Sequence, residues 1–79
     1  MIDRIYFRAA IHAPGQGLVG WASWATKGAC VRSERAGQHP HWESAKDSAE
    51  AYLNAMGDAA EGWEYVLERV TTDVERFEA

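Results

Sequence analysis

The chain has 79 residues, of which 47% are hydrophobic and 25% charged, and its formal net charge is −4. This length fits one domain, residues 1–79, which buries only about 60% of the surface of the unfolded chain. No run approaches the ~18 apolar residues of a membrane helix, a single cysteine excludes an internal disulfide, and the N-terminus lacks the pattern of a signal peptide. We therefore expect a small cytoplasmic protein without a membrane partner. Ala, Gly, Trp, Glu and Arg are frequent and Lys and Asn are scarce, which is typical of a GC-rich bacterial or phage genome and indicates a bacterial host cell.

The first predicted element is a strand over residues 4–12, because apolar side chains alternate there with polar ones. Pro14-Gly15-Gln16-Gly17 follows as a turn signal, since glycine accepts positive φ angles. Residues 18–25 then predict a second strand and a hairpin. Residues 29–35 are either a third strand or the continuation of the second strand beyond a bulge at Gly28.

A helix is predicted after the loop at residues 36–40, because apolar residues recur there at spacings of three and four. This stripe consists of Trp42, Ala45, Ala49, Tyr52, Leu53, Met56 and Ala60. Ser44 followed by Asp47 resembles a capping box, and Gly57 is a typical residue after the end of a helix.

The last segment, residues 63–77, fits either a helix face or a strand. We favour a strand, because the β-branched residues of the stretch from Val70 to Val74 prefer extended backbone. The predicted order is β-β-(β)-α-β. This is an α+β two-layer sandwich, with an antiparallel sheet of three to four strands and one helix packed on one face.

Four tryptophans, Trp21, Trp24, Trp42 and Trp63, are a high number for this length. Each buries roughly 150–250 Å² when it is enclosed, so together they are expected to supply much of the core. A core of this size has little room for all four, and a tryptophan left outside is a candidate contact residue.

The motifs for catalysis and metal binding are weak. His12, Cys30, His39 and His41 lack the spacing of a zinc site, so His39 and His41 are expected to be solvent-facing histidines of a loop. Cys30 lies in a strand-like stretch, where a lone cysteine is usually a small buried hydrophobe. We therefore expect no metal, no cofactor and no enzymatic activity.

Two further patterns have an ordinary structural explanation. Gly15-Gln16-Gly17 joins two strands, whereas a phosphate-binding loop leads into a helix, so a hairpin turn is the better interpretation. Acidic residues at helical spacing, such as Asp47 and Glu50, usually form a solvated face rather than a catalytic pair.

The charges are divided unevenly along the chain. Residues 1–42 hold five basic and two acidic residues, a net of +3, whereas residues 43–79 hold three basic and ten acidic residues, a net of −7. An array of carboxylates can occupy a basic groove built for nucleic acid and can steer association. The residues that we expect to make such contacts are Glu43, Asp47, Glu50, Glu61, Glu64 and Glu68.

An alternative binding surface lies on the predicted hairpin, where basic residues including Arg4 alternate with aromatic ones. Exposed aromatic rings beside basic groups hold single-stranded nucleic acid, although a net charge of −4 works against phosphate attraction. The residues of this alternative are Tyr6, Arg8, Trp21 and Trp24.

The passage from Arg35 to Ala45, together with the size, the acidic balance and the absence of catalytic motifs, resembles small phage-encoded type I anti-CRISPR proteins. That resemblance implies an inhibitor that binds an RNA-guided surveillance complex and blocks DNA recognition, in some cases as an acidic DNA mimic. The order of elements is also similar to that of antitoxins with a partial ribonuclease H-like fold.

These patterns together predict a small non-enzymatic binding protein. We expect it to inhibit a type I surveillance complex through its charged surface and steric occupation. The alternative is a regulator or antitoxin-like module that binds protein or single-stranded nucleic acid through the hairpin. An exposed sheet edge would also allow a homodimer.

Overall fold

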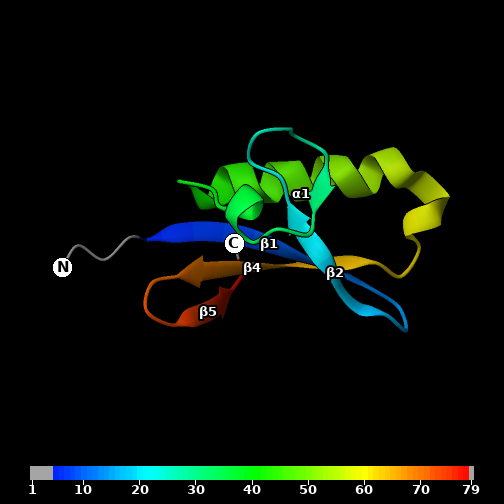
Figure 1. Ribbon diagram of the computed structural model, residues 1–79. Helices are drawn as coiled ribbons and strands as arrows, with labels where there is room; N and C mark the ends of the chain where they lie inside the picture. Colours follow the sequence, from blue (N-terminus) through cyan, green and yellow to red (C-terminus); the bar gives the residue numbers. More distant parts are fainter. Residues whose placement is uncertain (1–4, 79) are drawn as a thin grey trace.

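The computed structural model describes residues 5–78 and has the element order β-β-β-α-β-β, with two short 3₁₀ helices (Figure 1). The sheet is antiparallel and has the order β3-β2-β1-β4-β5. Its elements are β1 (Tyr6–Ala13), β2 (Gly17–Ala22), β3 (Cys30–Val31), η1 (Arg35–Gly37), α1 (Trp42–Met56), η2 (Gly57–Ala60), β4 (Glu64–Val70) and β5 (Val74–Phe77). The α+β class with one helix on one face is confirmed, but the sheet has five strands, not three to four.

The first two strands form the predicted hairpin. Gly15 and Gly17 take φ angles of 75° and 74° in the turn, a region that other residues rarely adopt. β1 lies at the centre of the sheet, where Ala10 is paired with Trp21 of β2 and with Val66 of β4. Residue 4, the first residue of the predicted strand, lies outside the described residues.

β3 is much shorter than the predicted third strand. The segment Thr26-Lys27-Gly28 turns the chain back, and the Ala29 amide donates to the Thr26 carbonyl at 3.1 Å. Trp21 then pairs with Val31 in antiparallel register, so the prediction of one long strand with a bulge at Gly28 is wrong.

α1 covers the predicted helical segment and ends where Gly57, at φ 57°, breaks the pattern. The capping box is wrong, because the N-cap is His41 and makes no side-chain cap bond. The Ser44 hydroxyl instead donates to the His41 carbonyl at 2.9 Å.

The last segment is extended, as favoured, but it contains two strands. Thr71, Thr72 and Asp73 reverse the chain, so that Val70 of β4 pairs with Val74 of β5. In this turn the Thr71 amide donates to the Asp73 carbonyl at 3.0 Å. This turn contains neither glycine nor proline, and the residues around it favour strands. The sequence therefore carries no sign of a turn there, and the fifth strand was not predicted.

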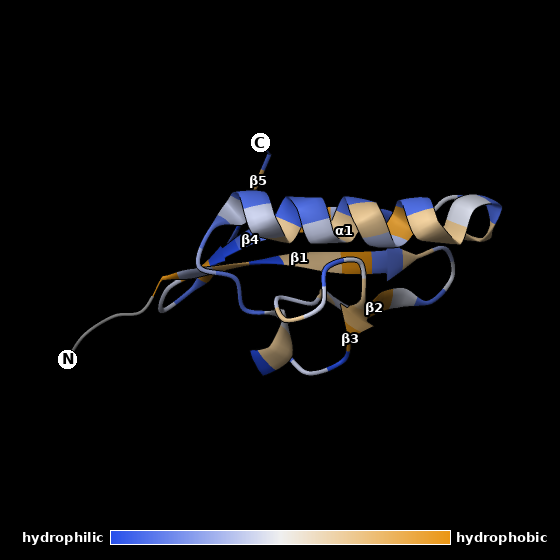
Figure 2. Ribbon diagram, turned by 90° about the horizontal axis from the view of Figure 1, so that it is seen from above, coloured by the Kyte–Doolittle hydropathy of each residue, from blue (hydrophilic) through white to orange (hydrophobic). Residues whose placement is uncertain are grey.

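The core between α1 and the sheet is built mainly from alanine. Its buried residues are Ala9, Ile11, Ala22, Ala45, Ala49 and Leu67. Small side chains on both layers let the helix approach the sheet closely, and α1 runs lengthwise along β1 (Figures 1 and 2). Trp42 and Trp63 are partly buried and pack against this core, so two of the four tryptophans add to it from its margins.

The opposite face of the sheet carries no second layer in the described part of the chain apart from η1 and its flanking loops. Gly37 of η1 lies directly against Trp21, since a Cβ atom on Gly37 would come within 2.6 Å of the Trp21 Cβ. Glycine is therefore required there. We call this surface the open face; Arg8, Ala10, Trp21 and Glu68 lie on it.

We predict that Ala49→Leu lowers the free energy of unfolding by about 1–3 kcal/mol, because the larger side chain overfills a closely packed core. Ala55→Leu, on an exposed position of the same helix, is the matched control and should change stability by less than about 0.5 kcal/mol. Urea unfolding followed by tryptophan fluorescence measures both. Equal effects of the two variants would show that the alanine contact does not limit the approach of the helix.

Candidate binding surfaces

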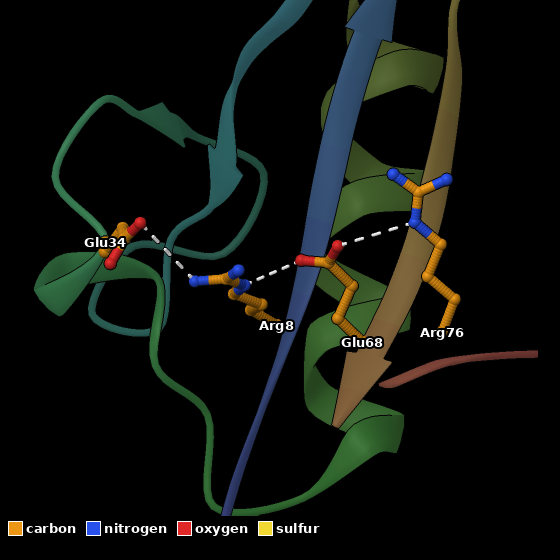
Figure 3. A network of polar contacts seen from close by, with 4 residues as sticks. All are labelled: Arg8, Glu34, Glu68 and Arg76. Atoms are coloured by element: carbon orange, nitrogen blue, oxygen red, sulfur yellow. Dashed lines mark hydrogen bonds and ion pairs between the residues drawn. The ribbon is translucent and has the colours of Figure 1, made fainter. Parts of the chain in front are cut away.

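A network of ion pairs lies on the open face (Figure 3). The Arg8 Nε donates to Glu68 Oε1 at 2.6 Å, and the two side chains are only 10% and 8% exposed. Glu34 and Arg76 approach this pair at 3.7 Å and 3.8 Å from opposite sides. The Arg8 guanidinium also lies over the Trp21 ring, 5.4 Å from its centroid, a distance at which a cation is attracted to the ring.

This network joins residues that the sequence assigned to two separate binding surfaces. Arg8 and Trp21 were predicted for the hairpin surface, and Glu68 for the acidic surface. In the structure, Arg8 and Glu68 pair with each other on the open face, where both side chains are nearly buried and a partner has little access to them. Sequence patterns do not reveal this pairing, because the two residues are 60 positions apart.

We predict that Glu68→Gln destabilises the fold by about 3 kcal/mol, because it removes the close, buried counter-charge of the Arg8 guanidinium and leaves it with Glu34, which is exposed and 3.7 Å away. The double variant Arg8→Met/Glu68→Leu should recover most of that loss, since apolar side chains replace both charges. Denaturant unfolding measures both variants. A single variant as stable as the unmodified chain would mean that the pair is well solvated.

The acidic surface is formed first by α1. Glu43, Asp47 and Glu50 are exposed and recur at spacings of four and three residues, so they are neighbours on the helix surface. Glu50 lies on the flank toward β4, and Asp47 lies on the flank toward the loop after β2. Glu61 and Glu64 are also exposed, in the connection to β4 and at its first residue. We call these five residues the acidic face; Glu68 does not belong to it.

Two of these carboxylates lie close to Tyr65 on the flank of the helix. The Tyr65 hydroxyl donates to Glu50 Oε2 at 3.1 Å, and Glu50 and Glu64 line one hollow with Tyr65. Burial raises the pKa of Tyr65, and the hydrogen bond to Glu50 and the charges of Glu50 and Asp47 raise that pKa further. The acidic face therefore has a local negative potential that disfavours a further anion.

A second exposed surface surrounds Trp24, whose side chain extends from the loop after β2. Trp24 is 51% and Ile5 58% exposed, and both line a hollow of about 460 Å³ with Tyr6 and Pro40. Tyr6 and Trp24 of the predicted hairpin surface are therefore together, whereas Arg8 and Trp21 lie elsewhere. Trp24 is the tryptophan that the small core leaves outside.

His39 supports this surface from below, and the prediction that it faces solvent is wrong. It is 1% exposed, and its backbone exchanges two hydrogen bonds of 2.8 Å with Phe7. The ring Nε2 lies 2.8 Å from the Ala22 carbonyl, which can only accept, so Nε2 carries the proton. Nδ1 of the neutral ring then faces the Ser44 hydroxyl at 3.3 Å.

The environment of His39 makes folding sensitive to acid. Burial lowers the pKa of His39 below its ordinary value, although the bond to the Ala22 carbonyl partly opposes this effect. An unfolded chain takes up the proton near pH 6.5 while the folded chain does not. Stability from this group is therefore present above pH 6.5 and is lost as the pH falls toward the lowered pKa of the folded state.

We predict that the free energy of unfolding falls between pH 7.5 and pH 5.5, and that His39→Gln removes most of this dependence. His41→Gln is the matched control, because His41 is exposed and its replacement should leave the slope unchanged. Urea unfolding at the two pH values measures all three chains. An unchanged slope in His39→Gln would assign the acid sensitivity to other groups.

The remaining candidates have structural roles. Cys30 packs against the core, and burial raises the pKa of its thiol although Arg32 lowers it in part; a catalytic thiol needs the opposite shift. Gly15 and Gly17 serve the hairpin turn. Among residues 5–78, no three His, Cys, Asp or Glu side chains are grouped closely enough to hold a metal ion.

No protein-family model, curated protein or solved structure matches this chain. Within the described residues, no helix is long and apolar enough to cross a membrane. The two exposed surfaces, the acidic face and the surroundings of Trp24, are therefore the observations from which a function is inferred.

Proposed function

We propose that this protein is a non-enzymatic inhibitor that docks its acidic face onto a basic, nucleic-acid-binding surface of a larger complex. The type I CRISPR surveillance complex is the partner that the sequence resemblance suggests. The observation that carries the proposal is the row of exposed carboxylates Glu43, Asp47 and Glu50 along α1.

The spacing of this row is comparable to that of phosphates. A rise of about 1.5 Å per residue places Glu43 and Glu50 about 10.5 Å apart along the helix axis, or one carboxylate per about 5 Å. One strand of DNA carries a negative charge per about 3.4 Å of axis. Lysines and arginines that line a nucleic-acid groove would therefore meet carboxylates on α1 at a spacing of the same order as the phosphates of DNA.

Cations of this chain do little to neutralise the acidic face. Arg8 is held by Glu68, and Arg69 is paired with Glu75 at 2.5 Å. Lys46 is the only basic residue of α1, and it lines the hollow that Glu50 and Glu64 share, on the flank of the helix. Lys27 lines another hollow together with Asp47. Glu43 and Asp47 nevertheless form no ion pair within 4.0 Å among the described residues, and their field extends into solvent over about one Debye length.

We predict that Glu43→Lys/Asp47→Lys weakens binding to a purified type I surveillance complex by at least about tenfold per reversed charge, because like charges then face each other. The control Asp58→Lys/Asp73→Lys makes the same change of net charge at exposed positions outside the acidic face. Biolayer interferometry at low and high salt measures the affinities, and circular dichroism checks that each variant folds.

Three outcomes of these affinity measurements contradict the proposal. They are no complex at either salt concentration, an unchanged affinity of Glu43→Lys/Asp47→Lys, or an equal loss of affinity in the control variant. Trp24→Ala, measured in the same way, tests the alternative surface. The exposure of Trp24 and Ile5 around one hollow favours that alternative. A loss of affinity in Trp24→Ala, with unchanged affinity in Glu43→Lys/Asp47→Lys, would show that the partner binds the surface around Trp24 instead.

A further inference from the structure

Two neighbouring hollows flank Phe77 beside the last strand. One, of about 430 Å³, has walls of Phe7, Trp42 and Phe77, whose rings meet edge to face with centroids 6.0 Å and 6.5 Å from that of Phe77. The other, of about 500 Å³, lies between the flank of α1 and β4 and is also lined by Phe77. They form where α1, which packs mainly on β1, β2 and β4, reaches the last strand through the contact of Trp42 with Phe77.

The two hollows differ in charge. In the first, Arg69 and Glu75 neutralise each other through an ion pair of 2.5 Å, so that aromatic rings dominate the site. The second contains the carboxylates of Glu50, Glu64 and Glu78 against the single ammonium group of Lys46. An apolar side chain fits the first hollow, and a Lys or Arg side chain fits the second.

The strand beside these hollows has a free edge. β5 is the last strand of the sheet, and in the described part of the chain only β4 pairs with it. Antiparallel pairing uses alternate backbone groups, so the other N–H and C=O groups of β5 point outward and are available to another strand.

We propose that the β5 edge binds an extended segment of a partner protein that presents an apolar residue and a Lys or Arg two positions apart. Glu75 and Phe77, two positions apart, lie beside the first hollow, and Phe77 and Glu78 beside the second. Side chains on one face of an extended peptide are about 6.6–6.8 Å apart. Backbone pairing supplies affinity and the two hollows supply specificity, as in other cases of strand addition.

A second copy of this chain is a poorer occupant of the edge. In such a dimer, two β5 strands would pair antiparallel around a two-fold axis perpendicular to the sheet. Each residue would then face the same side of the sheet in both copies. A register centred on the middle of the strand then sets Glu75 against Glu75 or Arg76 against Arg76. Like charges directly opposite each other destabilise a strand pair, and a strand of four residues offers little else in return.

The test is selection from a phage-displayed library of random nine-residue peptides on the intact, immobilised chain. We expect enrichment of sequences in which an apolar residue and a Lys or Arg are two positions apart, with one residue between them. A synthetic peptide of the enriched sequence should then slow amide hydrogen exchange in β5. Failure to enrich such sequences, or exchange in β5 that is unchanged by the peptide, overturns the proposal.

The variant Glu50→Gln/Glu64→Gln should weaken this peptide at least fivefold in fluorescence anisotropy and abolish its preference for Lys or Arg over Gln. Asp58→Asn/Asp73→Asn is the matched control and should bind as the unmodified chain does. Equal binding by all three chains contradicts the role of the second hollow. Analytical ultracentrifugation without peptide checks the alternative occupant, since a dimer with a protected β5 edge would overturn the proposal.

Glu43 and Asp47 take no part in this site. The double reversal Glu43→Lys/Asp47→Lys therefore tests the acidic face without the β5 edge, and the peptide selection tests the β5 edge without a surveillance complex. Failure of one proposal is distinguishable from failure of the other.

Discussion

The close contact between α1 and the centre of the sheet determines the rest of this structure. Ala45 and Ala49 of the helix meet Ala9 and Ala22 of the strands, and side chains of this size permit a short distance between the layers. They also bury little apolar area each, and hydrophobic stabilisation scales with that area. Large side chains at the margins add to it: Trp42 lies against Phe77 at one place, and Tyr52 against Trp63 at another, with ring centroids 6.5 Å and 6.4 Å apart.

The width of the sheet has a second consequence. Five strands spaced about 4.8 Å apart span about 19 Å, whereas a helix with its side chains is about 10–12 Å wide. A single helix centred near β1 therefore covers an outer strand incompletely, and the hollows beside Phe77 form there. On the open face, Trp21, η1 and the Arg8–Glu68 pair enclose the centre of the sheet in place of a second helix.

Local patterns in the sequence predicted the hairpin, the helix with its end at Gly57 and the α+β class, because these depend on neighbouring residues. The short β3, the turn at Thr71-Thr72-Asp73 and the burial of His39 depend on contacts with distant residues. His39, for example, lies in the loop before α1 and is fixed by Phe7 of β1 and Ala22 of β2. Of the candidate site, the exposed carboxylates of α1 follow from helical periodicity, but the removal of Arg8 and Glu68 from the surface does not.

The division of charge along the sequence is therefore not the division of charge in the fold. Arg8 comes from the positive half and Glu68 from the negative half, and the structure joins them as a nearly buried pair on the open face. That pairing removes one charge of each sign from reach and leaves the net charge unchanged. Arg69 is also paired with a glutamate on the neighbouring strand, so neither arginine compensates the exposed carboxylates of α1. A basic partner would meet those carboxylates on a helix whose opposite side is packed on the sheet through the alanine contact.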